Sequence, residues 1–479
     1  MKLIVSVVAI FVAGVLAQEA QPKLWAVLVA GSKGYFNYRH QADVCHAYQV
    51  LRAHGIPDEQ IIVMMQDDIA HNPENPTPGV IINHENGPNV YDHVPKDYTG
   101  KHVTPENFMK LLKGEAINGG TGKQLKSGPN DHVFINFVDH GGVGILAFPE
   151  DELTVKQWIE TLEYMHQHKR YGKMVIYVEA CESGSMFENH LSDHLNIFAT
   201  TASNAHESSY ACYYDDRRMT YLGDWYSVHW MEDSDKKNIL NETLRSQYKI
   251  TKQETTTSHV REYGDLTMGD MKVAEFQGLK KKNKTVTYQQ PSSLDLVESW
   301  DVPLATLHRR LLRADSKQQR KSLKQQIKQM KKNRHALRTM MESMAISMSS
   351  SEQMTASLLD LSPSVIGLAV QDKDCHHELV KHFSSKCLSF AKNPYALRYS
   401  HVLTNMCNQK IPLQMAKQAV EKFCSKLPKD TVRRLSHSGV VSIAPVASSP
   451  CCTQLPHLRP PVLQQGTLPL LHEMVLRIQ

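Results

Sequence analysis

A histidine and a cysteine each stand shortly after an apolar run in the first half of the chain. His140 follows the run Val133–Val138, and Cys181 follows the run Met174–Val178. A nearby imidazole can take the proton of a thiol, and the resulting thiolate is the nucleophile of a cysteine hydrolase. The backbone amides of Gly141 and Cys181 are candidate donors to the oxyanion of such a reaction. Taken alone, the cysteine fits a buried structural residue better than a catalytic one.

These apolar runs belong to a set with the pattern of a parallel β-sheet. Continuous apolar strands that alternate with helices indicate a sheet covered on both faces. We expect strands at Leu24–Ala30, Ile61–Met65, Val133–Val138, Met174–Val178 and Ile197–Ala202, and helices at Gln41–Arg52 and Thr154–His168. The 41-residue separation of His140 and Cys181 suits a β-α-β crossover. The crossover predicts an α/β domain with both side chains at the carboxyl edge of its sheet.

The two parts of the chain carry opposite charge. Residues 1–300 contain 28 Lys and Arg against 38 Asp and Glu, a formal charge of −10, whereas residues 301–479 carry +15. Much of the positive charge lies in a helical pattern at 304–345. Its basic residues are Arg309, Arg310, Arg313, Lys317, Arg320, Lys321, Lys324, Lys328, Lys331, Lys332, Arg334 and Arg338. The segment is either a solvated helical face or a segment that docks on the acidic first part.

The N-terminus has the pattern of a cleaved secretory signal peptide over residues 1–17. Lys2 precedes an apolar run that is shorter than the roughly 20 residues needed to span a bilayer. Sequons at Asn241 and Asn283 agree with a secretory route, which disfavours nucleic acid as a partner. A composition of 22% charged and 41% hydrophobic residues, with a mean hydropathy of −0.40, excludes a disordered chain and a multi-span membrane protein.

The nine cysteines divide into two groups. Four lie in a predicted helical region: Cys375, Cys387, Cys407 and Cys424. In an oxidising compartment these four would form two disulfides, with three possible connectivities. Cys45 and Cys212 are expected to be buried thiols, and His132 is expected to be structural. Neither Cys451-Cys452 nor any other group has metal-ligand spacing, so we predict no metal and no cofactor.

Longer motifs around these residues resemble those of one peptidase family. The motifs are Asn37–Asp43, Asp139–Gly141, Glu179–Ser185, Glu207–Asp215 and Tyr221–Val228. In this order they resemble the signatures of the legumain (asparaginyl endopeptidase) family, and the similarity extends over residues 24–428. The resemblance implies a caspase-like fold, which is a mostly parallel sheet flanked by helices. It also implies an all-α C-terminal prodomain stapled by disulfides.

The same resemblance implies roles for individual residues. Cys181 matches the nucleophile, His140 the general acid/base, and Asn37 the residue that orients the histidine. Asp139 matches a position that can carry a succinimide. The specificity pocket matches Arg39, Glu179, Ser209 and Asp224, with His40 beside them. Family members cleave after Asn, and after Asp at lower pH. A carboxamide offers one acceptor and two donors, which a cation and two carboxylates can satisfy together.

By resemblance the chain is a zymogen. The predicted divisions are a signal peptide (1–17), a catalytic domain (18–288), a linker and basic activation segment (289–345), a helical prodomain (346–428) and a tail without packed structure (429–479). Acid would protonate carboxylates of the first part and weaken the attraction between the two parts. Self-cleavage is therefore expected at Asp315 or Asn333.

The family pattern pairs Cys375 with Cys407 and Cys387 with Cys424. The implied partners are protein and peptide substrates, the prodomain as an intramolecular inhibitor, and cystatin-type inhibitors. The implied location is the secretory pathway, with a lysosome, another acidic vesicle or the extracellular space as the destination. One departure from the family is Lys33, where asparagine is usual.

Three alternatives stay open. A transpeptidase would use the same residues, because an amine can replace water in the attack on the Cys181 thioester. The catalytic subunit of the glycolipid-anchor transamidase would need a membrane segment after the catalytic domain, and none is present. The released basic helical fragment could instead act as a binding module.

Overall fold

A computed structural model describes residues 22–281, 288, 295–359 and 370–426. The predicted signal peptide (1–17), the Asn283 sequon, the Cys451-Cys452 pair and the predicted tail (429–479) lie outside the described residues. Within the described part of the chain, no helix is both long and apolar enough to cross a membrane.

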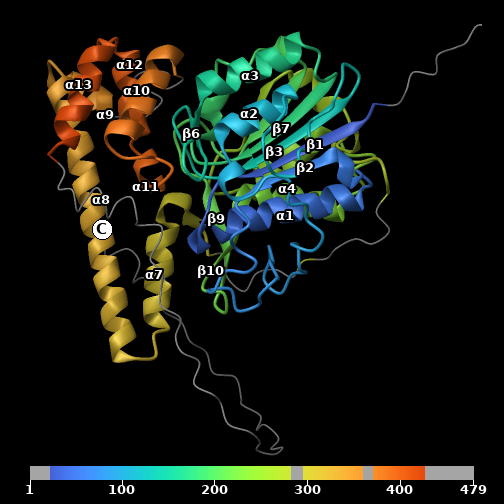
Figure 1. Cartoon of the computed structure of the whole chain (residues 1–479), viewed down its shortest axis with the longest axis horizontal. Helices are drawn as coiled ribbons and strands as arrows, with labels where there is room; N and C mark the ends of the chain where they lie inside the picture. Colours follow the sequence, from blue (N-terminus) through green and yellow to red (C-terminus); the bar gives the residue numbers. More distant parts are fainter. Residues whose placement is uncertain (1–21, 282–287, 289–294, 360–369, 427–479) are drawn as a thin grey trace, which may run out of the picture. The chain divides into compact units, whose positions relative to one another are not determined.

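A six-stranded sheet forms the centre of the first part of the chain (Figure 1). Its order is β11-β8-β7-β3-β1-β2, and β11 runs antiparallel to β8 while the other pairs are parallel. The strands are β1 (Leu24–Ala30), β2 (Ile61–Met65), β3 (His132–Val138), β7 (Lys173–Glu179), β8 (Ile197–Thr201) and β11 (Arg261–Gly264). The five predicted strands are confirmed to within one residue at each end. The sequence does not predict β11, because this edge strand is short, polar and incompletely buried.

Both faces of the sheet are covered, as the continuous apolar strands indicate. Ala26 and Leu28 of β1 enter one core, whereas Val27 and Val29 enter another, because side chains alternate along a strand. The first core is closed by α1 (Tyr38–Ala53), α4 (Trp225–Lys236), α5 (Leu244–Glu254) and α6 (Ala274–Gln277). The second core is closed by α2 (Pro105–Lys113) and α3 (Val155–Gln167). Figure 1 shows α1 and α4 on one side of the strands and α2 and α3 on the other.

Two three-stranded antiparallel sheets and several 3-10 turns complete this part. One sheet has the order β10 (Thr220–Asp224), β9 (Tyr210–Asp215) and β12 (Val297–Glu298), and the other β4 (Gly141–Gly142), β5 (Ile145–Ala147) and β6 (Glu152–Thr154). The turns are η1 (Tyr35–Asn37), η2 (Asp58–Gln60), η3 (Gly100–His102), η4 (Ser183–Met186), η5 (Asp193–Leu195), η6 (Leu266–Asp270) and η7 (Ser299–Asp301). In the chain, the sheet of β4, β5 and β6 follows β3, and strands β9 and β10 follow β8.

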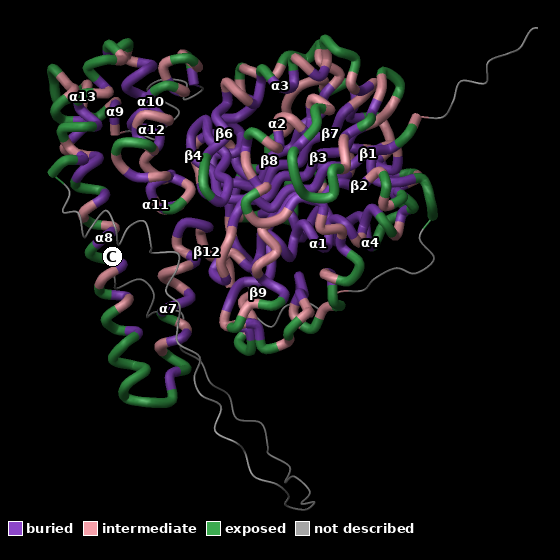
Figure 2. The backbone as a smooth tube through the Cα atoms, in the orientation of Figure 1, coloured by how far each residue is buried: buried purple, intermediate pink, exposed green. Residues whose placement is uncertain are grey.

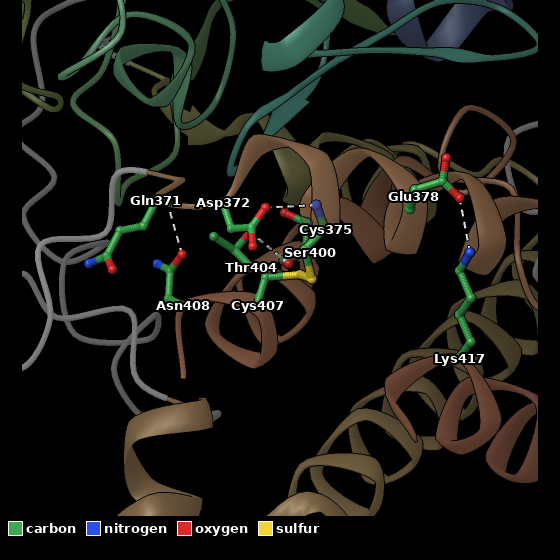
Figure 3. The surroundings of a disulfide bond; sticks show 9 residues. All are labelled: Gln371, Asp372, Cys375, Glu378, Ser400, Thr404, Cys407, Asn408 and Lys417. Atoms are coloured by element: carbon green, nitrogen blue, oxygen red, sulfur yellow. Dashed lines mark hydrogen bonds and ion pairs between the residues drawn. A yellow bond between two sulfur atoms is a disulfide. The ribbon is translucent and has the colours of Figure 1, made fainter. Parts of the chain in front are cut away.

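The C-terminal part of the described chain is helical, as predicted. Its helices are α7 (Val302–Leu312), α8 (Lys317–Met348), α9 (Glu352–Leu359), α10 (Lys373–Lys386), α11 (Pro394–Leu397), α12 (Ser400–Asn408) and α13 (Leu413–Cys424). Disulfide Cys375–Cys407 ties α10 to α12 (Figure 3), and disulfide Cys387–Cys424 ties the end of α10 to α13. The pairing implied by the family resemblance is therefore confirmed.

Helix α8 is continuous across the division predicted at residue 345. Its apolar side chains, among them Leu337, Met341 and Met344, enter the core of the C-terminal helices. Figure 2 shows the remaining surface of α8 as a largely exposed strip, and lysines such as Lys317 and Lys324 lie on it.

Candidate active site

The two residues singled out for chemistry follow neighbouring strands. Strands β3 and β7 pair in parallel, with Val138 opposite Glu179. A β-carbon on Gly141 would lie 2.2 Å from the carbonyl oxygen of Cys181. Only glycine therefore allows the chain after His140 to lie directly against the Cys181 backbone. The predicted convergence of the histidine and the cysteine at one sheet edge is confirmed.

Asn37 determines which nitrogen of His140 can act as a base. The Asn37 side-chain nitrogen donates to the Lys33 carbonyl at 2.8 Å, so its oxygen faces His140 Nε2 at 2.9 Å. The oxygen is an acceptor, and Nε2 must therefore carry the proton in the neutral ring. His140 Nδ1 is then the unprotonated nitrogen, and it lies 3.5 Å from Ser299 Oγ. The Lys33 carbonyl therefore fixes the orientation of this amide.

The Cys181 thiol is buried and contacts two serines. Its sulfur lies 3.2 Å from Ser208 Oγ and 3.8 Å from Ser209 Oγ. Burial raises the pKa of the Cys181 thiol to about 12, and the neighbouring Glu182 carboxylate adds to this rise. Burial and the charge of Arg39 lower the pKa of His140 well below its ordinary value. In this state both groups are neutral. The sequence did not identify Ser208, which lies beside the predicted pocket residue Ser209.

The residues predicted for specificity form one buried cluster. Arg39 Nε donates to Asp224 Oδ1 at 2.8 Å, and Arg39 Nη2 donates to Ser299 Oγ at 2.6 Å. Glu179 Oε2 accepts from the backbone nitrogen of Ser227 at 2.9 Å and from its hydroxyl at 3.0 Å. Burial raises the pKa of Glu179 well above its usual range, and the charge of Asp224 raises it further. One guanidinium and two carboxylates thus converge where a polar side chain can be held.

His40 and Asp139 lie between this cluster and His140. His40 Nδ1 lies 2.7 Å from Ser32 Oγ and 3.3 Å from Asp139 Oδ1. The His40 and His140 rings meet edge to face with centroids 4.9 Å apart. Burial raises the pKa of Asp139 well above its usual range. In the described residues, His40, Asp139 and His140 each place one atom that could bind a metal ion within 4.8 Å of the others. The sequence did not predict this grouping.

Comparison with known proteins identifies the family. Residues 24–279 match the Peptidase C13 family, and residues 325–424 match the legumain prodomain. The chain belongs to the Peptidase C13 (legumain) family. It is 51% identical to legumain of Rattus norvegicus over 86% of this chain and 94% of that one, and 49% identical to legumain of Homo sapiens over 84% and 93%. It is 45% identical to hemoglobinase of Schistosoma japonicum over 84% of this chain and 92% of that one.

Membership makes the chain a legumain-type cysteine peptidase with a prodomain, and it confirms the predicted caspase-like fold class. A solved structure of caspase-1 from Spodoptera frugiperda also matches, with a TM-score of 0.33 and 10% identity over 55% of this chain and 92% of that one.

A segment just before the prodomain occupies this site. Strand β12 pairs antiparallel with β9, and the Ser299 backbone nitrogen donates to the Ser209 carbonyl at 2.9 Å. The Ser299 side chain contacts both Arg39 and His140. The chain thus adds its own strand beside the pocket, which is a common way for peptides to bind at a sheet edge. The sequence predicts a linker and basic activation segment at 289–345, and it gives no sign that one of its serines contacts Arg39 and His140.

The prodomain contacts the catalytic domain next to this segment. Ser400 Oγ accepts from the Val143 backbone nitrogen at 2.9 Å, and His376 Nε2 donates to the Val143 carbonyl at 3.0 Å. Ion pairs lie at the edge of this contact, and the lysine comes from the prodomain in some of them and from the catalytic domain in others. They are Lys381–Asp151 at 2.8 Å, Lys392–Glu150 at 3.1 Å and Lys156–Asp374 at 2.5 Å. The two domains are therefore joined by buried hydrogen bonds to the Val143 backbone, and ion pairs surround this contact.

The docking role predicted for the basic segment is correct for only part of it. Arg310 pairs with Glu74 at 2.8 Å, and Arg313 pairs with Asp216. The lysines from Lys317 to Lys332 are exposed instead, because the opposite, apolar face of α8 is the buried one. For these lysines the solvated-face interpretation is the correct one.

The other predicted residues fall as follows. Cys45 and Cys212 are buried free thiols, and the ring of His132 stacks on Phe276, so their structural interpretation is confirmed. The sequon residue Asn241 is exposed. Of the two candidate cleavage residues, Asp315 is exposed between α7 and α8, whereas Asn333 is buried within α8. The two residues therefore differ in their accessibility to a peptidase.

Proposed function

We propose that this legumain-family peptidase hydrolyses peptide bonds after asparagine, and after aspartate at lower pH. The observation that carries the proposal is the Arg39–Asp224 ion pair beside Glu179. Only His40 and Asp139 separate this cluster from His140. The carbonyl oxygen of an asparagine side chain can accept from Arg39, while its amide nitrogen donates to the two carboxylates. An ionised aspartate would meet those carboxylates, so it binds only where acid has protonated one of the groups.

In the proposed reaction Cys181 is the nucleophile, and His140 is the general acid and base. His140 Nδ1 takes the thiol proton as Cys181 Sγ attacks the scissile carbonyl carbon. The amides of Gly141 and Cys181 donate to the oxyanion. The protonated imidazole then gives its proton to the leaving amine, and a thioester remains on Cys181. Water, deprotonated by His140, attacks the thioester and releases the acid product and the thiol.

Asn37 is the proposed orienting residue, because its oxygen holds the Nε2–H of His140. Asp139 is retained as a proposed site of succinimide formation, in which the backbone nitrogen of His140 would attack the buried side-chain carboxyl carbon of Asp139 and release water. No cofactor takes part in the proposed reaction.

We further propose that acid releases the prodomain and that self-cleavage follows. Residues 289–345 would be the activation segment and residues 346–428 the prodomain. The exposed Asp315 is the more accessible cleavage residue, whereas cleavage at Asn333 would first require unfolding of α8. Exposed Asn241 supports glycosylation in the secretory pathway, and a lysosomal or secreted destination fits acid activation. Cystatin-type inhibitors remain a proposed partner class.

Cleavage of paired fluorogenic peptides tests the proposal. The peptides differ only in Asn or Gln before the scissile bond, and acid-treated protein is compared with the Cys181→Ala variant. Asn cleavage at least tenfold faster than Gln cleavage, and absent from the variant, is the expected result. Equal cleavage of both peptides would refute the specificity, and cleavage by the variant would refute the nucleophile. Mass analysis of the products in the presence of an added amine separates hydrolysis from the transpeptidase alternative.

A further inference from the structure

A buried histidine of the prodomain lies in its contact with the catalytic domain. His376 stands in the first turns of α10, and its Nε2 donates to the Val143 carbonyl at 3.0 Å. A β-carbon on Gly144 would lie 2.7 Å from His376 Cε1, and the Gly144 backbone has a positive φ of 70°. Glycine therefore lets the ring lie directly against the turn between β4 and β5. Docking of the prodomain thus buries this edge of the imidazole.

The docked ring has a place for one proton only. The Val143 carbonyl is an acceptor, so Nε2 carries the proton of the neutral imidazole. A second proton would go to Nδ1, which is buried and has no hydrogen-bond partner among the described residues. An imidazolium there would be a buried cation with an unsatisfied N–H, close to the N-terminus of α10, whose dipole also opposes a cation. Protonation of His376 therefore suits the released prodomain and opposes the docked one.

The charged and titratable groups around His376 do not compensate for this burial. They are Asp372, Lys373, Asp374 and His377 of α10, and His190 of the catalytic domain. The two aspartates are engaged elsewhere, in the helix cap and in an ion pair with Lys156. Burial lowers the pKa of His376 to about 4, and the charges of the two other histidines lower it further, although the hydrogen bond to Val143 opposes this fall. The docked ring therefore stays neutral well below the ordinary value of 6.5.

The carboxyl groups at the edge of the contact do not release the prodomain in this pH range. Hydrogen bonding to a lysine lowers the pKa of Asp374, and lysine neighbours lower that of Glu150 although burial opposes this. These exposed groups keep their charge above pH 4.5, and exposed ion pairs add little to docking. Burial raises the pKa of Glu152 to about 6, and a raised pKa of a carboxyl group favours the docked form as the pH falls. A loss of docking between pH 6.5 and pH 4.5 therefore requires an imidazole.

We propose that His376 is the acid-sensing residue of the domain contact, and that protonation of its Nδ1 expels the ring from Val143 and releases the prodomain. The inference rests on the proposed acid release and names the group that triggers it. The pKa of His376 is lower in the docked form, so its contribution to docking is full above pH 6.5 and is lost as the pH falls toward about 4. Each pH unit in this window raises the ratio of released to docked chains up to about tenfold. His377, which is half-buried and lies 2.8 Å from Thr154 Oγ1, adds a smaller effect of the same sign.

Hydrogen exchange at the Val143 amide measures the uncovering directly, because this N–H donates to Ser400 Oγ of the prodomain. We would follow it by mass spectrometry in the full-length Cys181→Ala protein, which lacks the proposed nucleophile, and divide each rate by its intrinsic value at that pH. Protection in this parent should fall roughly 10- to 30-fold from pH 7.5 to pH 5. In His376→Gln, which keeps a donor for Val143 and never carries a charge, the fall should be about threefold or less.

His376→Phe is a second uncharged variant, which keeps the ring and loses the donor. It should show less protection than the parent at pH 7.5 but the same weak dependence on pH. The matched control is His382→Gln, the same change in a histidine of α10 that lies 3.2 Å from Glu421 of α13, and it should keep the parent's profile.

The possible failures are distinguishable. A steep fall in both His376 variants would overturn the assignment to His376 and leave acid release standing. Protection of the parent that does not change with pH would overturn the proposed acid release and this inference together. Neither result depends on the asparaginyl specificity, which the paired Asn and Gln peptides test separately.

Discussion

The Ser400→Ala substitution should activate the uncleaved chain. It destabilises the covered form, in which the prodomain is docked on the catalytic domain, and leaves the open form unchanged. Ser400 Oγ accepts the backbone N–H of Val143, and both residues are buried. Removal of the hydroxyl leaves a buried donor without this acceptor, which costs about 1–3 kcal/mol. When the prodomain is displaced, water can satisfy Val143 in either protein. The equilibrium between covered and open forms should therefore shift about 5- to 150-fold toward the open form.

The assay is cleavage of the Asn peptide at neutral pH, with intact mass showing that the chain remains uncut. Ser385→Ala is the matched control, since Ser385 is exposed on α10 and its hydroxyl donates only to the His382 carbonyl of the same helix. Thermal melts of both variants check that the disulfide-linked helices remain folded. An Ser400→Ala protein as inactive as the parent, or an equal gain in the control, would refute the reasoning.

Two further predictions concern the catalytic loop and the charged rim. Gly141→Ala should lower kcat at least tenfold with little change in fold, because its β-carbon would lie 2.2 Å from the Cys181 carbonyl oxygen; steady-state kinetics with a circular dichroism control checks this. Although burial opposes it, the ammonium groups of Lys33 and Lys392 lower the pKa of Glu150 below the ordinary 4.5. Its contribution to docking is therefore present above pH 4.5 and lost as the pH falls through the lowered value. Glu150→Gln should speed prodomain release about 1.5- to 5-fold at pH 6 and by less at pH 3.5, where the carboxylate takes up its proton, as followed by intact mass. An equal effect at both pH values would contradict the assignment.

The sequence predicts those parts of the fold that depend on local pattern. The strands that end at Val138 and Glu179 are buried on both faces, so their apolar runs are continuous and their ends are visible. A single crossover between them makes His140 and Cys181 neighbours without further information. The family resemblance adds the pocket residues and the disulfide pairing, which spacing alone leaves with three solutions.

The parts that the sequence does not predict depend on long-range packing. Ser299 reaches the pocket only because β12 pairs with β9, and an isolated serine in a linker carries no sign of this pairing. Asp43 lies in a recognised motif, yet its hydrogen-bond partners, the Asn83 side chain and the Asp224 backbone, are 40 and 181 residues away in sequence. The face that α8 buries also depends on its partners, since a long basic helix offers the same charge to solvent or to a neighbour.

The contacts of Ser299 indicate that the prodomain inhibits through tethering and not through a tight fit. The Ser299 hydroxyl accepts one hydrogen bond from Arg39 and lies 3.5 Å from His140 Nδ1. On the proposed specificity, an asparagine side chain would accept from Arg39 and also donate from its amide nitrogen to the two carboxylates, so such a substrate would match the pocket better than this segment does. The segment nonetheless stays in place because β12 and the docked helices hold it there at a high effective concentration. Loss of the contacts at Val143 removes that advantage, and the better-matched substrate then displaces Ser299.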